Sequence, residues 1–290
     1  MMTAMVSVVD ISNIARGNVS ITSKFLPSGS IAALREDARA LLKAGAFVSG
    51  ELKIDRKRRR HEESKSTTID KRTRVCDVCG IFDDTENVDI SVGDRDARDE
   101  LLDVVSDLRE LLINKLGIEL SESMELQYLH YPGSTNNNES DCAKNNGTHK
   151  EEGFYRRHFD HTGDEDGPFI RKVSLLLYLN DDGWDSSTDG GILRAYVRPT
   201  MKSKRDGSCD DVNGDSQTID IVPEGGKLVL FDSSAVEHEV FTTKKERWAV
   251  VGWFLMDRRI EGKMKKKRVR AHHRSNGASN RSTSKKGRTR

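Results

Sequence analysis

The chain has 290 residues, of which 35% are hydrophobic and 33% are charged, and its formal net charge is +1. This length suits one catalytic domain with extensions or two small domains. The high content of charged residues excludes a chain in which every segment contributes to a hydrophobic core. No apolar run approaches the roughly 20 residues that a membrane-spanning helix needs. The first residues lack a basic start and carry Asp10 inside their apolar stretch, so they do not predict a secretory signal. We expect a cytoplasmic and/or nuclear protein.

Charge is distributed unevenly along the chain. Residues 258–290 hold 14 Lys and Arg against one acidic residue, a net of +13, so residues 1–257 must carry −12. This tail and the basic cluster at 55–61 predict weak contacts with polyanions or nuclear import signals. No aromatic residues interleave with the basic ones, so neither segment predicts a surface on which bases stack.

The four cysteines do not predict a disulfide framework, because their spacing is irregular and we expect a reducing compartment. Cys76 and Cys79 form a CxxC pair that would supply half of a zinc site, but no second pair follows to complete it. We therefore expect ordinary thiols at Cys76 and Cys79; the other two cysteines are Cys142 and Cys209.

Two amphipathic helices are predicted in the first half of the chain. Residues 30–45 place apolar side chains at helical spacing, with Ser28 or Ser30 as the cap and Gly45 at the end. Residues 94–116 give the strongest helical pattern, with a face of leucine and valine that ends before Gly117. The segment between them is charged near 53–72 and lacks apolar periodicity, so we expect a loop there.

After the second helix the apolar period becomes that of strands. Gly, Asn and Asp clusters separate the segments. Helices followed by about six strands predict an α+β protein whose second half is a β-sandwich or jelly roll. Two polar stretches, 133–153 and 200–217, predict long loops. The predicted strands are 124–131, 172–180, 191–197, 225–233, 237–243 and 247–255.

One motif carries chemistry. His158 and Asp160 are two residues apart, so on a strand their side chains leave the same face. Two histidines and one carboxylate on one face of an octahedron leave three positions open, the arrangement of non-haem iron(II) oxygenases. Alone the motif is weak, but His238 follows in a predicted strand and supplies a second histidine.

Arg247 lies nine residues after His238 and opens an apolar strand. A buried guanidinium binds a carboxylate through two parallel hydrogen bonds, which suits the distal carboxylate of 2-oxoglutarate. The simpler alternatives stay open from these residues alone: His238 as a strand histidine near a turn, and Arg247 as a surface charge.

From Met124 to Asp257 the sequence resembles the catalytic domain of the iron(II)- and 2-oxoglutarate-dependent prolyl 4-hydroxylases, most closely the hypoxia-inducible-factor type. The order of the matching blocks and the intervals between them agree with that family. The blocks are HYPG (130–133), YRRHFD (155–160), LLYLND (176–181), GGILR (190–194), GGKLVLFDS (225–233), HEV (238–240) and RWAVVGWF (247–254).

The resemblance implies a double-stranded β-helix (jelly-roll) core and the cofactors Fe(II), 2-oxoglutarate, O2 and L-ascorbate. By position it implies His158, Asp160 and His238 as iron ligands and Arg247 as the 2-oxoglutarate anchor. The other cosubstrate contacts that it implies are Tyr178 at the same carboxylate, Tyr131 near the metal end, Leu193 as an apolar pocket residue and Trp253 as a wall beside the iron. Half-buried strand tyrosines remain the alternative for Tyr131 and Tyr178.

We therefore expect a dioxygenase that hydroxylates prolyl residues of a protein or peptide, with release of succinate and carbon dioxide and a possible role in oxygen sensing. The alternatives are a non-prolyl 2-oxoglutarate oxygenase and a non-catalytic nucleic-acid-binding protein that uses the basic clusters. The expected organisation is a disordered N-terminus (1–22), a helical support region (23–120) with its charged insertion, the dioxygenase domain (121–257) and a disordered basic tail (258–290).

Overall fold

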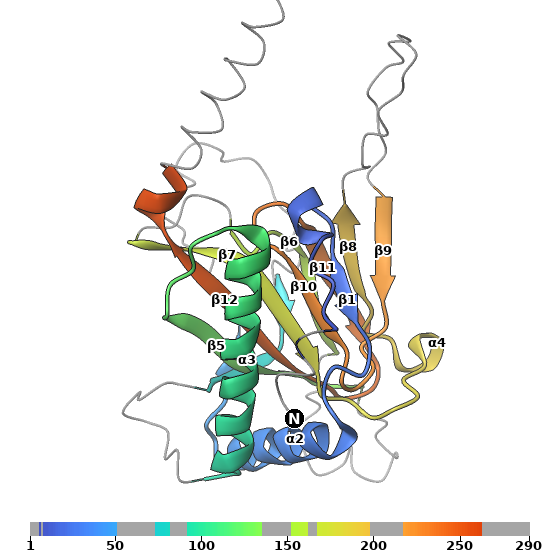
Figure 1. The fold of residues 1–290 in the computed structure, drawn as a ribbon. Helices are drawn as coiled ribbons and strands as arrows, with labels where there is room; N and C mark the ends of the chain where they lie inside the picture. The colour runs from blue at the N-terminus through green and yellow to red at the C-terminus, as the bar shows by residue number, and fades with distance from the viewer. Residues whose placement is uncertain are drawn as a thin grey trace, which may run out of the picture.

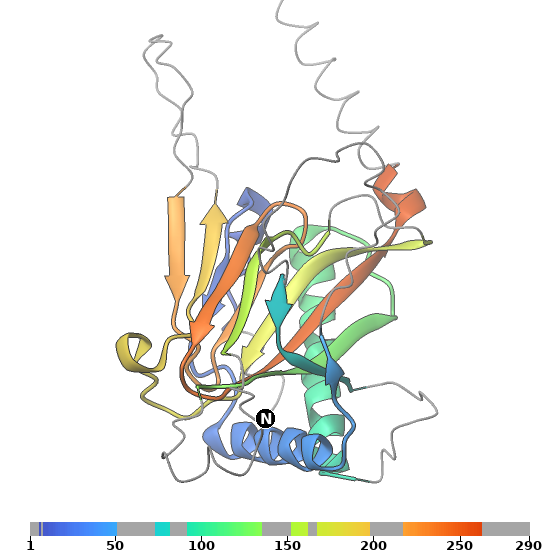
Figure 2. The same cartoon turned by 180° about the vertical axis from the view of Figure 1, so that it is seen from behind.

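The computed structural model describes residues 6, 8–50, 73–81, 92–134, 152–161, 167–197 and 217–262. Within these ranges the chain forms two antiparallel sheets with two long helices on one side (Figures 1 and 2). The major sheet has the strand order β1-β10-β7-β12-β5-β4-β2 and the minor sheet the order β3-β6-β11-β8-β9. The helical elements are η1 (Ile14–Arg16), α2 (Ser28–Lys43), α3 (Arg95–Leu116) and α4 (Ser186–Asp189).

From β5 to β8 and again from β9 to β12, successive strands alternate between the two sheets, as in a jelly roll. In chain order they are β1 (Ser20–Thr22), β2 (Val48–Ser49), β3 (Arg74–Val75), β4 (Asp77–Gly80), β5 (Met124–Tyr131), β6 (Gly153–His158), β7 (Phe169–Tyr178), β8 (Leu193–Val197), β9 (Gln217–Ile221), β10 (Leu228–Asp232), β11 (Glu237–Thr243) and β12 (Arg247–Asp257).

The central strand β12 separates two hydrophobic cores. Trp248, Val250 and Phe254 belong to the core between the major sheet and the helices, whereas Ala249 and Val251 belong to the core between the two sheets. Successive side chains of a strand point to opposite faces, which explains this division. The predicted α+β jelly roll is thus confirmed.

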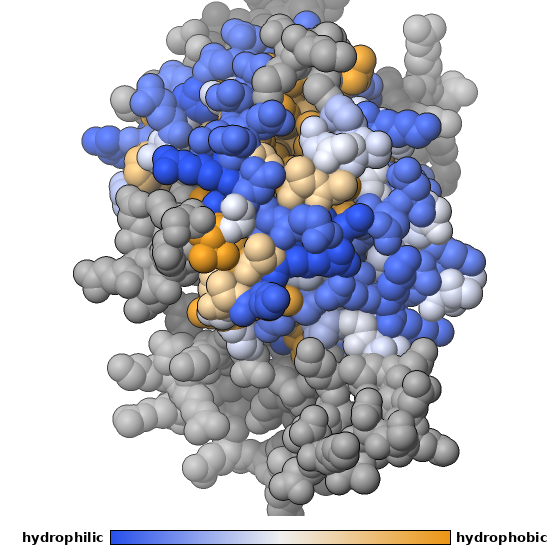
Figure 3. All heavy atoms as spheres, turned by 90° about the horizontal axis from the view of Figure 1, so that it is seen from below, coloured by the Kyte–Doolittle hydropathy of each residue, from blue (hydrophilic) through white to orange (hydrophobic). Residues whose placement is uncertain are grey.

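Helices α2 and α3 pack against the outer face of the major sheet. On α2 the exposed side chains Glu36, Arg39 and Lys43 recur at helical spacing. The face of the molecule at the α2 end is accordingly mostly hydrophilic, with smaller hydrophobic patches (Figure 3). No helix in the described ranges is both long and apolar enough to cross a membrane.

The predicted cap of α2 is wrong. The N-cap residue is Pro27, no side chain caps this end, and Ser28 is already the first helical residue. Proline fixes φ and starts a helix well, so no serine cap is needed here. At α3 the Asp94 carboxylate accepts from the Ala97 N–H at 3.1 Å, and Gly117 ends the helix with φ 61°.

The expected disordered N-terminus is also wrong for the residues described there. Strand β1 pairs with β10, and the side chains of Val9, Ile11 and Ile14 are buried in the helix-side core. These apolar residues are stabilised by the core and the sheet edge that they cover, which are tertiary contacts that the local sequence does not reveal. The tail likewise starts with helical residues at 258–262.

The support region is not only helical, because β2, β3 and β4 extend both sheets. These strands are two to four residues long, too short to give a periodic pattern. The insertion near 53–72, the greater part of the predicted loops at 133–153 and 200–217, and the tail beyond 262 lie outside the described residues.

A buried polar cluster fastens the helices to the sheet. The Asp37 carboxylate of α2 accepts from the Tyr128 hydroxyl of β5 at 2.7 Å and from the Asp94 N–H at 2.6 Å. Arg98 of α3 lies 3.5 Å from the same carboxylate. Asp37 and Tyr128 are almost completely inaccessible to solvent, so each hydrogen bond replaces one that water would make.

We predict that Tyr128→Phe lowers the free energy of unfolding by about 1–2 kcal/mol, because it leaves a buried carboxylate short of a donor. Urea unfolding followed by circular dichroism measures the change. Tyr196→Phe makes the same chemical change at a partly exposed bond to Glu239 and should cost less than about 0.5 kcal/mol. Equal losses for the two variants would contradict the role of the cluster.

Candidate metal and cosubstrate site

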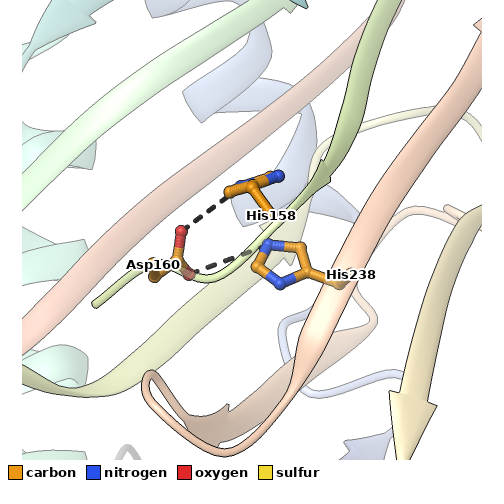
Figure 4. A group of neighbouring side chains, drawn as sticks. All are labelled: His158, Asp160 and His238. Atoms are coloured by element: carbon orange, nitrogen blue, oxygen red, sulfur yellow. Dashed lines mark ion pairs between the residues drawn. The ribbon is translucent and has the colours of Figure 1, made fainter. Parts of the chain in front are cut away.

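The structure brings His158, Asp160 and His238 together (Figure 4). His158 ends β6, His238 lies in β11, and the antiparallel pairing of these strands sets the two histidines directly opposite each other. Asp160 follows β6 and turns back toward both rings. One ligand atom from each residue lies within 4.8 Å of the others, the one such group of His, Cys, Asp and Glu in the described part of the chain.

The hydrogen bonds of both imidazoles leave their Nε2 atoms available. His158 Nδ1 lies 2.8 Å from the Arg156 carbonyl and His238 Nδ1 lies 3.3 Å from the Val236 carbonyl. A carbonyl only accepts, so each Nδ1 carries a hydrogen, and in the neutral ring the lone pair is then on Nε2. The Nε2 atoms lie 3.5 Å and 3.8 Å from the Asp160 oxygens.

The protonation states also suit ligands. Burial lowers the pKa of His238 to about 4, so its ring is neutral at pH 7. Burial alone would raise the pKa of Asp160, but His238, His158 and the Ser174 hydroxyl together hold it well below its usual range. The site therefore offers two imidazoles, of which that of His238 is neutral, and one carboxylate.

This donor set fits a divalent transition metal of the iron type. Two histidines and one carboxylate form the facial triad of non-haem iron(II) sites. His158 Nε2 is buried without a hydrogen-bond partner, which is unfavourable unless a ligand occupies it. Ligand atoms about 2 Å from one ion stand up to about 4 Å apart, so small side-chain rotations close the set.

Arg247 forms a second feature of the same interior. Its side chain is 1% exposed, and its Nε and Nη2 have no hydrogen-bond partner. No carboxylate among the described residues pairs with it. A buried guanidinium without an anion is costly, so the geometry indicates an anionic ligand at this point.

Two tyrosines flank this guanidinium. Its Cζ lies 4.8 Å from the ring centroid of Tyr131 and 5.1 Å from that of Tyr178. The Tyr178 hydroxyl is buried without a partner, and burial raises the pKa of Tyr178 to about 12, so it remains a neutral donor. Gly191 permits close packing on this side, because an added Cβ would lie 3.0 Å from the Arg247 Cδ.

The remaining predicted contacts lie in the core between the sheets. Leu193 is completely buried in β8. Trp253 pairs in register with Ser174, whose hydroxyl contacts Asp160, so it lies on the side of the metal ligands. The guanidinium of Arg171 covers the Trp253 ring at 3.7 Å. Tyr131, Tyr178, Leu193 and Trp253 thus all belong to the core between the two sheets.

Three further residues were missed by sequence reasoning. Ser174 contacts Asp160 from the major sheet, Ser233 contacts Ser174, and Tyr155 stacks on His158 with ring centroids 3.6 Å apart. Tyr155 falls within the YRRHFD block, which was a usable signal. Ser174 lies inside an apolar run, and a single serine there carries no pattern.

The CxxC pair does not form a metal site. Cys76 points into the core between the sheets and Cys79 into the helix-side core, so the two thiols lie on opposite faces. Burial raises the pKa of Cys76 to about 11, which keeps it a thiol. The expectation of ordinary thiols stands for these two; Cys142 and Cys209 lie outside the described residues.

Comparison with known proteins agrees with this geometry. Residues 145–255 match the family model of the 2OG-Fe(II) oxygenase superfamily. No curated protein matches the sequence.

Among solved structures, a Pseudomonas putida prolyl-4-hydroxylase is similar with a TM-score of 0.55 and 25% identity, over 88% of this chain and 98% of that chain. A Trichoplax adhaerens prolyl hydroxylase in complex with a hypoxia inducible factor peptide fragment gives 0.54 and 22%, over 88% and 87%. A Phytophthora capsici prolyl 4-hydroxylase gives 0.56 and 17%, over 89% and 65%.

We predict that His158→Ala, Asp160→Ala and His238→Ala each abolish stoichiometric binding of Fe(II), because each removes one of only three protein ligands. Anaerobic titration calorimetry measures the binding. His130→Ala is the control: this buried histidine contacts Asp77 and Glu246 instead, so its loss should leave iron affinity unchanged. Full iron binding by any of the three ligand variants would refute this site.

Proposed function

We propose that this chain, an iron(II)- and 2-oxoglutarate-dependent dioxygenase of the 2OG-Fe(II) oxygenase superfamily, hydroxylates prolyl residues of a protein or peptide and releases succinate and carbon dioxide. The observation that carries the proposal is a facial triad and a buried unpaired Arg247 facing one interior, in a chain 25% identical to a prolyl-4-hydroxylase over most of its length. The peptide held by the Trichoplax adhaerens protein supports a peptide substrate.

The metal would be held by His158, Asp160 and His238. When bound, Fe(II) supplies the oxidative chemistry that couples decarboxylation of 2-oxoglutarate by O2 to hydroxylation of a substrate C–H bond. The carbonyl acceptors at both Nδ1 atoms fix the orientation of the rings. Ascorbate, typical of prolyl hydroxylases, is the expected accessory reductant.

The cosubstrate would be anchored at its distal carboxylate by Arg247, with the Tyr178 hydroxyl as a second donor. Both groups are buried and lack partners, so binding an anion would satisfy three orphaned polar atoms at once. Leu193 and Val251 present only apolar surface in this core, which excludes water around the carbon chain. Tyr131 would then lie toward the metal.

The two alternatives differ in support. A non-prolyl oxygenase would use the same metal and the same Arg247 anchor, and only the product distinguishes it. A nucleic-acid-binding protein would use the basic clusters at 55–61 and in the tail, which lie outside the described residues. A cytoplasmic and/or nuclear location and a role in oxygen sensing remain predictions from the sequence.

We predict that the protein converts 2-oxoglutarate to succinate faster with proline-containing peptides than without peptide, and that the peptide gains one oxygen atom at proline. Succinate release and peptide mass spectrometry measure the two effects. A matched peptide with each proline replaced by alanine is the control. Oxygen gain at another residue, or turnover independent of peptide, would favour the non-prolyl alternative.

We predict that Arg247→Ala raises the Kd for 2-oxoglutarate on the order of 100-fold, because a charge-assisted pair is worth about 3 kcal/mol. Tyr178→Phe should raise it about fivefold to tenfold, from a neutral hydrogen bond of ~1 kcal/mol. Arg247→Lys should recover only part, since a point charge does not reproduce the planar fork. Calorimetric titration of the Fe(II)-loaded protein under anaerobic conditions measures each.

The control for charge removal is Arg194→Ala. Arg194 makes an exposed two-bond pair with Asp220, so its loss should leave 2-oxoglutarate affinity unchanged. Thermal melting of every variant reports whether it is folded. If folded Arg247→Ala binds 2-oxoglutarate as tightly as the unsubstituted protein, the anchor is wrongly assigned.

A further inference from the structure

A pair of buried serines connects the major sheet to the carboxylate of the metal site. Ser174 Oγ lies 2.7 Å from Asp160 Oδ2 and 2.8 Å from Ser233 Oγ. Ser174 comes from β7 and Ser233 follows β10, and neither is exposed to solvent. Both histidines of the site belong to strands of the minor sheet. The serine pair contacts the Asp160 carboxylate from the opposite side, the major sheet.

The hydrogens of this pair can be placed from its chemistry. The Asp160 carboxylate only accepts, so the Ser174 hydroxyl hydrogen is used in that bond. Ser174 Oγ can then only accept from Ser233, and Ser233 must donate. The result is a chain of two hydrogen bonds, in which Ser233 donates to Ser174 and Ser174 donates to Asp160.

Both serines are rigidly held. Ser174 pairs in register with Phe231 of β10 and Trp253 of β12, so its backbone lies within the sheet. The Ser233 N–H donates to the Lys172 carbonyl and its carbonyl accepts from the His161 N–H, both at 3.1 Å. A donor on such a backbone restricts the rotation of the carboxylate that it contacts.

We infer that Ser174, oriented by Ser233, is a positioning residue that fixes Asp160 as a one-oxygen ligand of the proposed metal site. The restraint falls on Oδ2, which lies 3.8 Å from the His238 Nε2, while Oδ1 accepts no serine hydrogen bond and lies 3.5 Å from the His158 Nε2. Without the hydroxyl the carboxylate can rotate and bind the metal through both oxygens. The second oxygen would then occupy a coordination position that the cosubstrate needs. This inference rests on the iron site of the proposed function, and on no substrate identity.

The test uses Co(II) as the probe, because its visible absorption changes with coordination number. Ser174→Ala should raise the Kd for Co(II) on the order of tenfold, as expected for loss of an outer contact to a metal ligand. At saturating Co(II) its spectrum should differ from that of the unsubstituted protein. Ser174→Thr keeps the hydroxyl on a strand that favours β-branched residues, so it should restore most of the affinity and the original spectrum.

A matched control separates positioning from general packing. Ser20 is also buried in the major sheet, and its hydroxyl donates to the Asp10 carbonyl, away from the metal ligands. Ser20→Ala should lower thermal stability in the way that Ser174→Ala does, and leave Co(II) binding and its spectrum unchanged.

The outcomes are distinct. If Ser174→Ala is folded and binds Co(II) with unchanged Kd and spectrum, the positioning role is overturned. If Ser174→Ala does not fold, Ser233→Ala is the deciding variant. It should raise the Kd for Co(II), but by less than the increase expected for Ser174→Ala. An unchanged Kd would overturn the proposed role of the two serines. If the unsubstituted protein does not bind Co(II), the metal site itself fails.

Discussion

The arrangement of the core between the two sheets depends on one buried cation, Arg247, which has no anionic partner among the described residues. Arg247 opens the central strand of the major sheet, and its guanidinium is almost completely buried between Tyr131 and Tyr178. Two aromatic faces attract a cation but do not satisfy its N–H groups. The folded protein therefore holds a buried guanidinium whose Nε and Nη2 lack hydrogen-bond partners, and that cost is offset elsewhere by the two cores that β12 separates.

The two-sheet construction explains how the proposed metal ligands and the proposed anchor share one interior. The minor sheet supplies His158 and His238 as a directly opposed pair, and the major sheet supplies Arg247 from its own inner face. Asp160 lies where the sheets meet, held by Ser174 from the opposite side. The site is thus sensitive to the separation of the sheets, which the buried side chains between them determine.

Much of this architecture could be predicted from sequence, because strong periodicity and specific motifs carried it. Strands β5 and β11 and the end of α3 fall at their predicted boundaries. The short strands β1 to β4 could not be predicted, since two to four residues give no period and their stability comes from pairing with longer strands. The serine chain was equally invisible: it depends on which strands are neighbours, and register is a tertiary property.

The ordered N-terminus shows the same limit of prediction from sequence, because here the sequence predicted disorder where the structure has buried residues. The predicted disordered segment spans 1–22, yet Val9, Ile11 and Ile14 are buried and β1 covers the edge of β10. An uncovered edge next to β10 would expose the strand that precedes Ser233. Because Ser233 donates to Ser174 and Ser174 to Asp160, the edge strand stabilises the base of the hydroxyl chain. A segment far from the metal ligands in sequence therefore supports their geometry through one sheet.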